Sequence, residues 1–296
     1  MSQPVINRLS ETEQQYTVKD FKSDLKPVWC SGCGDFGILT ALVQSFAKLG
    51  IPRDEIATIT GIGCSSRLPG YLSTYGFNSL HGRAVPIAGG VKLANPNTMV
   101  IASGGDGDGF SIGAGHLPHA VRRNIDITYI VMDNFVYGLT KGQASPTTPL
   151  DDKTASTTYG SIEPPLNMCG FVHAYNCGFI ARTHSGDIKQ MVSVFMEGLQ
   201  YPGFAFIQVF SPCVTFRGNG EYAAVKQMVG QLPEDYDNSN REAAWKIIES
   251  KDPYYTGVIY RNDNLPSFHD RINGMREKAK AKGTKSVDEL FAIFRP

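Results

Sequence analysis

The chain has 296 residues, enough for one large α/β domain or two small ones with a sizeable core. Basic and acidic residues number 28 each, and this neutral balance gives no support for nucleic acid or an anionic membrane as the main partner. The polar start does not resemble a signal peptide and no apolar run of about 18 residues occurs, so we expect a cytoplasmic protein that does not span a membrane.

The predicted elements follow a polar arm, residues 1–26. In chain order, apolar periodicity predicts a helix, a strand, a helix and a strand, over residues 37–49, 55–60, 84–92 and 98–102. The next elements are a helix, a strand, two helices and a strand, over residues 110–123, 127–132, 165–175, 187–199 and 204–210.

The region 98–132 has the order strand, glycine-rich loop, helix, strand, which is a βαβ unit and implies a parallel sheet. We therefore predict an α/β fold with a doubly wound, mostly parallel sheet and helices on both faces. Residues 27–232 form the predicted main domain. Beyond it the charge rises and the alternation of strands and helices is lost. We interpret residues 233–296 as a C-terminal extension that packs on partner subunits.

The strongest local motif is Gly105–Asp106–Gly107, at the end of a predicted strand, and the next strand ends before Asn134. Open α/β sheets bind ligands at the carboxyl ends of their strands. The glycines let the backbone close on a diphosphate, and the following helix offers its N-terminal amides. A diphosphate also requires Mg²⁺, for which oxygens of Asp106 and Asn134 and the carbonyl of Val136 are suitable ligands.

The alternative is an ordinary turn, because Asp, Asn and Gly are common at strand ends. The strand–loop–helix–strand context favours the cofactor site. Gly107–Asp108–Gly109 is a second copy of the motif, and we prefer Asp106 because it is closer to the strand end. A dinucleotide site is disfavoured because residues 61–66 lack the last glycine of that fingerprint.

Four of the six cysteines lie in turns, at Cys30, Cys33, Cys64 and Cys213. The last two follow strands, on the side where the diphosphate is expected. Four thiolates complete the ligand set of a 4Fe–4S cluster or a structural zinc. A redox C-x-x-C pair with two buried cysteines is the remaining interpretation. Cys169 and Cys177 lie on or after an apolar helix, and we expect them to pack in the core.

Five motifs, in order from about residue 27 to 218, resemble the β subunit of 2-oxoacid:ferredoxin oxidoreductases: WCSGCGDFG, GIGCSSR, HGRAVPIAGGVKLANP, GGDGDGFSIGAGH and DNFVYGLTKGQ. The first motif departs from the family at Ser31, where proline is usual. That position lies between two cysteines and does not remove a ligand.

The resemblance implies a thiamine-diphosphate-binding fold with Mg²⁺ and one 4Fe–4S cluster. By position, the cluster ligands are Cys30, Cys33, Cys64 and Cys213. The Mg²⁺ ligands are Asp106, Asn134 and the Val136 carbonyl. The other candidate cofactor-binding residues lie in the same motifs: Gly63, Ser65, His81, Gly105, Gly107, Asp108, Tyr137, Gly138, Leu139 and Thr140.

Such enzymes decarboxylate a 2-oxoacid with thiamine diphosphate, pass electrons through the cluster to ferredoxin and transfer the acyl group to coenzyme A. The reaction also runs toward carboxylation. The family keeps the glutamate that activates the cofactor on its larger α subunit, and nothing in this sequence resembles a second, pyrimidine-binding domain. The resemblance therefore implies an assembly of α and β subunits, a heterotetramer, in which this chain alone is inactive.

Among substrates we favour 2-oxoglutarate, because Arg67 is a candidate cation for its distal carboxylate. Pyruvate and broad 2-oxoacid use stay open. Lys141 is the second candidate catalytic residue, able to meet a carboxylate or phosphate, although a solvated surface residue is an equal interpretation of each. A non-redox thiamine-dependent decarboxylase would not need four cysteines. A zinc-stapled binding module would not need the Gly-Asp-Gly motif.

Overall fold

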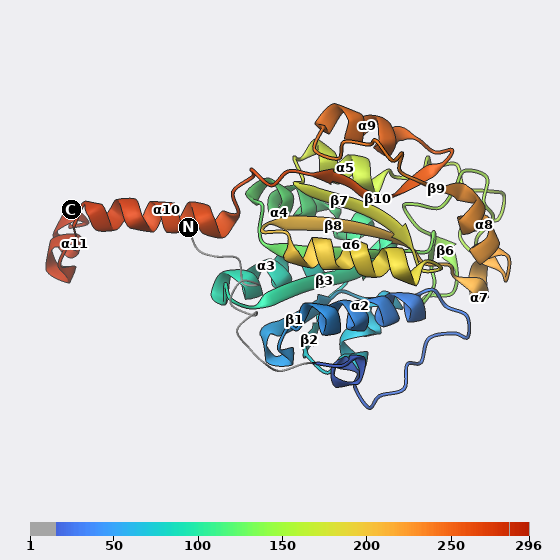
Figure 1. Cartoon of the computed structure of the whole chain (residues 1–296), viewed down its shortest axis with the longest axis horizontal. Coiled ribbons are helices and arrows are strands. Elements are labelled where there is room, and N and C mark those ends of the chain that lie inside the picture. The colour runs from blue at the N-terminus through green and yellow to red at the C-terminus, as the bar shows by residue number, and fades with distance from the viewer. Residues whose placement is uncertain (1–15, 284, 296) are drawn as a thin grey trace.

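Figure 1 shows the computed structural model of the chain, which describes residues 16–283 and 285–295. The strands are β1 (Ile56–Thr60), β2 (Tyr75–Asn78), β3 (Met99–Gly105), β4 (Ile127–Asp133), β5 (Val136–Tyr137), β6 (Gln143–Ala144), β7 (Phe179–His184), β8 (Phe204–Phe210), β9 (Val229–Gln231) and β10 (Tyr254–Arg261). Eight of them form one sheet in the order β2-β1-β3-β4-β8-β7-β10-β9, and β5 and β6 pair separately. All pairs in the large sheet are parallel except β7 with β10.

The α-helices are α2 (Asp35–Leu49), α3 (Ala84–Ala94), α4 (Leu117–Arg123), α5 (Met168–Ala174), α6 (Ile188–Gln200), α7 (Val214–Arg217), α8 (Glu221–Met228), α9 (Arg241–Glu249), α10 (Phe268–Ala281) and α11 (Val287–Ile293). Helices α2 and α6 cover one face of the sheet, and α3, α4, α5 and α9 cover the other. Along β4, Ile130 and Met132 pack toward the first face and Tyr129 and Val131 toward the second. Burial of both faces explains why β4 and β8 are continuous apolar runs.

The predicted doubly wound fold is confirmed, and the strand 204–210 has the predicted bounds. The predicted helix 110–123 is only partly correct. It is an α-helix from Leu117 onward, and it is preceded by a π-helical turn, Asp108–Ile112, and a 3-10 turn, Ala114–His116. Three glycines in this stretch weaken a regular α-helix, whereas Pro118 suits the first turn of α4.

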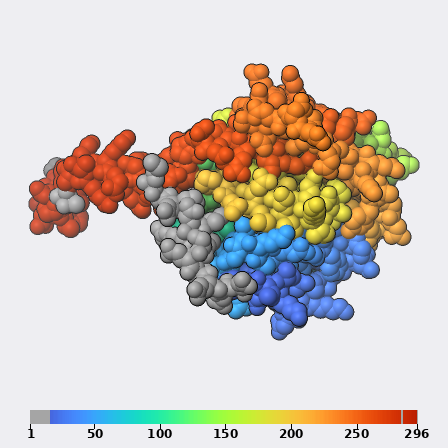
Figure 2. Space-filling model, in the orientation of Figure 1, coloured from blue at the N-terminus to red at the C-terminus, as the bar shows by residue number. Residues whose placement is uncertain are grey.

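The expected loss of strand–helix alternation after residue 231 is wrong for part of that segment. Helix α9 is followed by β10, which pairs antiparallel with β7 and so continues the large sheet. Gly257 and a break in register after Val258 interrupt the apolar pattern of β10. Among the helices and strands of the described residues, α10 and α11 extend beyond the body, as the red arm in Figure 2.

Part of the predicted arm 1–26 lies outside the described residues. From Tyr16 onward the chain packs on the body, because a short 3-10 helix buries Phe21 and Lys22 bridges to Leu72. In the residues that the structure describes, none of the helices has the length and apolar character needed to cross a membrane.

Candidate cofactor site

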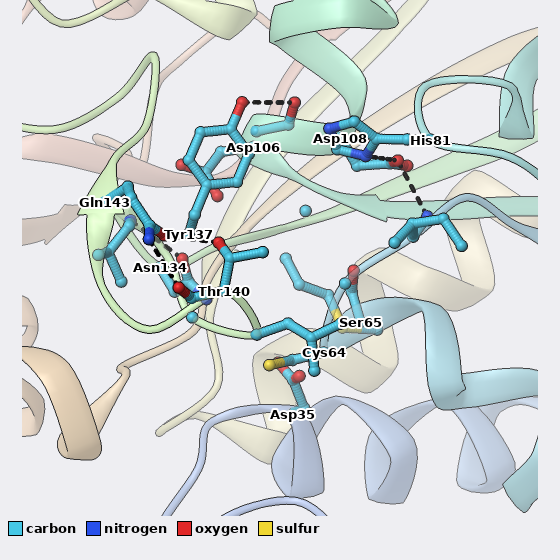
Figure 3. Close-up of a pocket in the computed structure, with 18 of the residues that line it drawn as sticks. Asp35, Cys64, Ser65, His81, Asp106, Asp108, Asn134, Tyr137, Thr140 and Gln143 are labelled. Atoms are coloured by element: carbon cyan, nitrogen blue, oxygen red, sulfur yellow. Dashed lines mark hydrogen bonds and ion pairs between the residues drawn. The ribbon is translucent and has the colours of Figure 1, made fainter. Parts of the chain in front are cut away.

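A cavity of about 530 Å³ opens at the carboxyl ends of β1, β3 and β4. Every predicted cofactor-binding residue lines it except Cys30, Cys33 and Cys213. The parallel register explains this convergence, because the loops that follow neighbouring parallel strands leave the sheet at one edge. Figure 3 shows Asp106, Asp108 and His81 on one side of the cavity and Cys64 with Asp35 on the opposite side.

Asp106 is buried at the end of β3 and lines the cavity. None of the ion pairs in the described part of the chain includes it. The Thr147 hydroxyl lies 2.6 Å from Asp106 Oδ2 and 2.8 Å from Asp133 Oδ1. Burial raises the pKa of Asp106, and burial followed by the charge of Asp106 raises the pKa of Asp133 to about 7. A buried carboxylate without a cation, facing an open cavity, fits a divalent metal ion bound there.

Asp108 has different surroundings. Its Oδ1 accepts hydrogen bonds from the backbone amides of Ile62, at 3.0 Å, and Gly82, at 2.7 Å. The same oxygen lies 2.9 Å from His81 Nδ1. Asp108 therefore holds two loops together, and its bonds favour Asp106 as the metal ligand.

The loop after β4 forms another wall. Asn134 Oδ1 accepts the Val136 amide at 3.1 Å, which fixes the first turn of this loop. Tyr137 donates its hydroxyl to the Gly107 carbonyl at 3.2 Å. A Cβ on Gly107 would lie 2.2 Å from the Tyr137 ring, so only glycine permits this close approach. The cavity wall also offers a donor to an anion. The buried Ser65 hydroxyl has no protein partner among the described residues, so its hydrogen bond is free for a bound group.

Close packing around Gly34 brings the first two cysteines to the third loop. Cys30 and Cys33 form a turn immediately before α2. The Gly34 amide donates to the Pro212 carbonyl at 3.1 Å, and a Cβ on Gly34 would lie 2.5 Å from the Ser211 hydroxyl. This contact places the Cys30–Cys33 turn beside Cys213.

Cys64 is held to the same region from the other side. Its carbonyl accepts the Trp29 indole N–H at 2.8 Å. A Cβ built on Gly138 would lie 3.4 Å from Cys64 Sγ and 3.8 Å from Cys213 Sγ. The loop that lines the cavity therefore also touches two of the four cysteines.

The four thiols influence one another electrostatically. Burial raises the pKa of Cys33, Cys64 and Cys213, to about 11 for Cys64, and further contributions come from Asp35 and from the other cysteines. Cys30 contributes to the shifts of Cys64 and Cys213. The four cysteines thus form one group, in which the raised pKa values of Cys33, Cys64 and Cys213 keep these three thiols protonated at neutral pH unless a metal displaces the protons.

Within residues 16–283 and 285–295, no three His, Cys, Asp or Glu side chains are placed to hold a single metal ion. An iron–sulfur cluster is a larger body than one ion, so its four thiolates stand further apart. Cys169 and Cys177 are fully buried in the second face of the core, as expected.

Arg67 and Lys141 do not line the cavity, and both are exposed in this chain. Arg67 lies near enough to Cys64 for its charge to lower the pKa of that thiol, against the larger effect of burial. Lys141 follows the cavity-lining Thr140 and has a positive φ of 79°. Their proposed contacts with substrate stay predictions.

Some lining residues were not predicted as cofactor-binding, namely Asp35, Ile62, Met132, Gln143 and Ala144. Asp35 is the most unusual of them, because burial raises its pKa to about 6 while it accepts the Ser211 hydroxyl at 2.7 Å. It lies two residues after Cys33, inside the WCSGCGDFG motif, and this position was the available signal.

Two family models match the chain. The model of the thiamine pyrophosphate enzyme, C-terminal TPP binding domain, matches residues 61–209. The model of the C-terminal part of the pyruvate ferredoxin oxidoreductase beta chain matches residues 213–277. Together they cover all of the cavity lining except Asp35, the cysteine loop after β8, and the sheet from β2 to β10.

Individual curated proteins and a solved structure are also similar to the chain. The 2-oxoglutarate oxidoreductase subunit KorB of Mycobacterium tuberculosis is 42% identical, over 95% of this chain and 88% of that protein. The 2-oxoacid:ferredoxin oxidoreductase 2, subunit beta, of Aeropyrum pernix is 37% identical over 86% of each. A chain of the 2-oxoglutarate:ferredoxin oxidoreductase from Magnetococcus marinus, with 2-oxoglutarate, coenzyme A and succinyl-CoA bound, superposes with a TM-score of 0.92 at 36% identity, over 97% of this chain and 98% of that one.

Proposed function

The chain belongs to the β subunits of 2-oxoacid:ferredoxin oxidoreductases, and from this premise we propose that it binds thiamine diphosphate and Mg²⁺ beside one 4Fe–4S cluster. The observation that carries the proposal is the shared wall between cavity and cysteines. Cys64 lines the cavity and belongs to the cysteine group, and Gly138 lines the cavity while approaching two of the sulfurs.

The residues divide the work. Asp106, Asn134 and the Val136 carbonyl would hold the metal, and Ser65 would donate to a phosphate oxygen. Asp108 accepts a hydrogen bond from His81 Nδ1, so Nε2 is the ring nitrogen that this bond does not occupy. When bound, thiamine diphosphate supplies the nucleophile and electron sink for decarboxylation, and the cluster supplies a one-electron carrier.

We propose 2-oxoglutarate as the substrate, with coenzyme A as acyl acceptor, ferredoxin as electron partner and a reaction that is reversible. The relatives named for 2-oxoglutarate support this choice. Pyruvate or broad 2-oxoacid use is the alternative, because other matches are named for 2-oxoacids or pyruvate. Arg67 and Lys141 are the proposed substrate-binding residues.

The proposed partner that completes the site is the α subunit. The cavity rim exposes apolar side chains, with Ile62 at 44% and Leu139 at 46% of their surface. An apolar rim around the cavity suits a covering protein surface better than solvent. We also propose that the arm formed by α10 and α11 packs on partner subunits.

The test is anaerobic purification of the chain together with its α subunit. A brown complex with about four irons per β subunit, reducing a low-potential dye with 2-oxoglutarate and coenzyme A, would support the proposal. A colourless, iron-free complex that still decarboxylates would indicate a non-redox thiamine enzyme. Zinc in place of iron, with no thiamine diphosphate bound, would indicate a binding module. Parallel assays with pyruvate decide the substrate.

A further inference from the structure

A network of buried polar side chains runs from the cavity into the core. We propose that Thr147, which belongs to this network, is a positioning residue for Asp106. The inference rests on the proposed function, because it concerns how Asp106 is presented to the metal and diphosphate. Thr147 does not line the cavity, so it acts through Asp106 and not on the cofactor itself.

The polar contacts are continuous. Because the Thr147 hydroxyl has a single proton, it donates to Asp106 while it accepts from Asp133 when that carboxyl is protonated. Thr147 Oγ1 lies 2.6 Å from Asp106 Oδ2 and 2.8 Å from Asp133 Oδ1. Gln208 Nε2 donates to the second oxygen of Asp133 at 2.8 Å. Arg182 Nε donates to Gln208 Oε1 at 3.0 Å. All five side chains are buried. Such a network costs free energy wherever a group is left without a partner, so its members hold one another in place.

Arg182 fixes the orientation of the Gln208 amide, and with it the order of donors and acceptors in the network. Arg182 is 1% exposed, and none of the ion pairs in the described residues includes it. The Gln208 amide presents its oxygen to this guanidinium and its nitrogen to Asp133. Flipping the amide would place its NH₂ group against a cation and its oxygen against an acceptor, so both ends would be lost. Asp133 is thereby anchored, and its remaining oxygen faces Thr147.

The loop that carries Thr147 is pinned independently. The Ser145 amide donates to Thr148 Oγ1 at 2.8 Å, and the Thr148 amide donates to the Ser145 carbonyl at 3.1 Å. The Thr148 hydroxyl donates to the Phe135 carbonyl at 2.7 Å, which lies in the loop after β4. Thr148 thus fixes the loop, and the neighbouring Thr147 makes the contact with Asp106. Variants of Thr147 and Thr148 can therefore separate the contact with Asp106 from the fixing of the loop.

The test is calorimetric titration of thiamine diphosphate into the cofactor-stripped αβ complex at several Mg²⁺ concentrations. Thr147→Val keeps the side-chain shape and removes the hydroxyl. We expect its affinity to fall by about 10- to 100-fold, the range for a hydrogen bond to a charged group, with a higher Mg²⁺ requirement. Thr147→Ser should restore most of the affinity. Thr148→Val, the loop control, should have a clearly smaller effect.

Melting temperature and iron content verify that each variant complex is folded. Wild-type affinity in Thr147→Val, equal losses in Thr147→Val and Thr147→Ser, or an equal loss in Thr148→Val would each overturn the positioning role. None of these results would touch the proposed function, provided the wild-type complex binds the cofactor. A wild-type complex that binds no thiamine diphosphate would overturn both.

Discussion

The two aspartates of the repeated Gly-Asp-Gly motif should respond to alanine in opposite ways. Asp108 accepts the backbone amides of Ile62 and Gly82 on one oxygen. Asp108→Ala leaves both amides without their acceptor, at a cost of about 1–3 kcal/mol each, or about 2–6 kcal/mol together. For a chain of this length each kcal/mol lowers the melting temperature by about 2 °C, so we expect a decrease of about 4–12 °C.

Asp106→Ala should leave the melting temperature of the cofactor-free protein nearly unchanged. Burial raises the pKa of Asp106, which means that its ionised form is disfavoured in the folded chain. The variant should instead lose the binding of thiamine diphosphate, because the carboxylate ligand of Mg²⁺ is missing.

Both variants are compared as αβ complexes stripped of metal and cofactor, by thermal unfolding and by calorimetric titration with thiamine diphosphate and Mg²⁺. Asp108→Asn is the matched control, since its amide oxygen can still accept from both loops. If Asp108→Ala lost binding at an unchanged melting temperature, and Asp106→Ala melted early, the two roles would be reversed.

Three further predictions concern other parts of the site. Cys64→Ser should lose cluster iron, because a hydroxyl is a poor iron ligand, whereas Cys177→Ser should keep it; equal iron contents would contradict the ligand set. Arg67→Met should lower kcat/KM by roughly 30-fold for 2-oxoglutarate and little for pyruvate, and equal losses would refute a contact with the distal carboxylate. Burial raises the pKa of Asp133 from 3.8 to about 7, so the folded cofactor-free protein holds a proton that the unfolded chain releases. The denaturant midpoint of the cofactor-free protein should therefore fall as pH rises from about 4 to about 7. In Asp133→Asn the midpoint should depend less on pH.

The parts of the site that sequence predicts are those that depend on strand ends. Gly105–Asp106–Gly107 follows β3 and Asn134 follows β4, and parallel pairing of these strands is enough to bring them together. Cys64 and Cys213 follow β1 and β8 in the same way. No detail of side-chain packing was needed, because neighbouring parallel strands end at one edge of the sheet.

The remaining parts depend on contacts between distant and irregular segments. Asp35 reaches the cavity because Gly34 packs against Ser211, a contact between segments that lie far apart in the chain. Thr147 lies in a loop without regular structure, so no periodicity in the sequence indicates where its side chain points. Strand β10 was missed because Gly257 breaks its apolar pattern and because several of its residues are only partly buried.

The junction between the cavity and the cysteines has a simple structural basis. In the proposed function, thiamine diphosphate would supply electrons in pairs and a 4Fe–4S cluster would accept them one at a time, so the two groups would be useful to each other only as close neighbours. The chain achieves this closeness with one turn after β1 and one after β4. Cys64 lines the cavity and belongs to the cysteine group, and Gly138 in the cavity wall lies close to the sulfurs of Cys64 and Cys213. If the proposed function holds, the chain would couple the two chemistries within one domain, and the activation of the cofactor would be left to the α subunit.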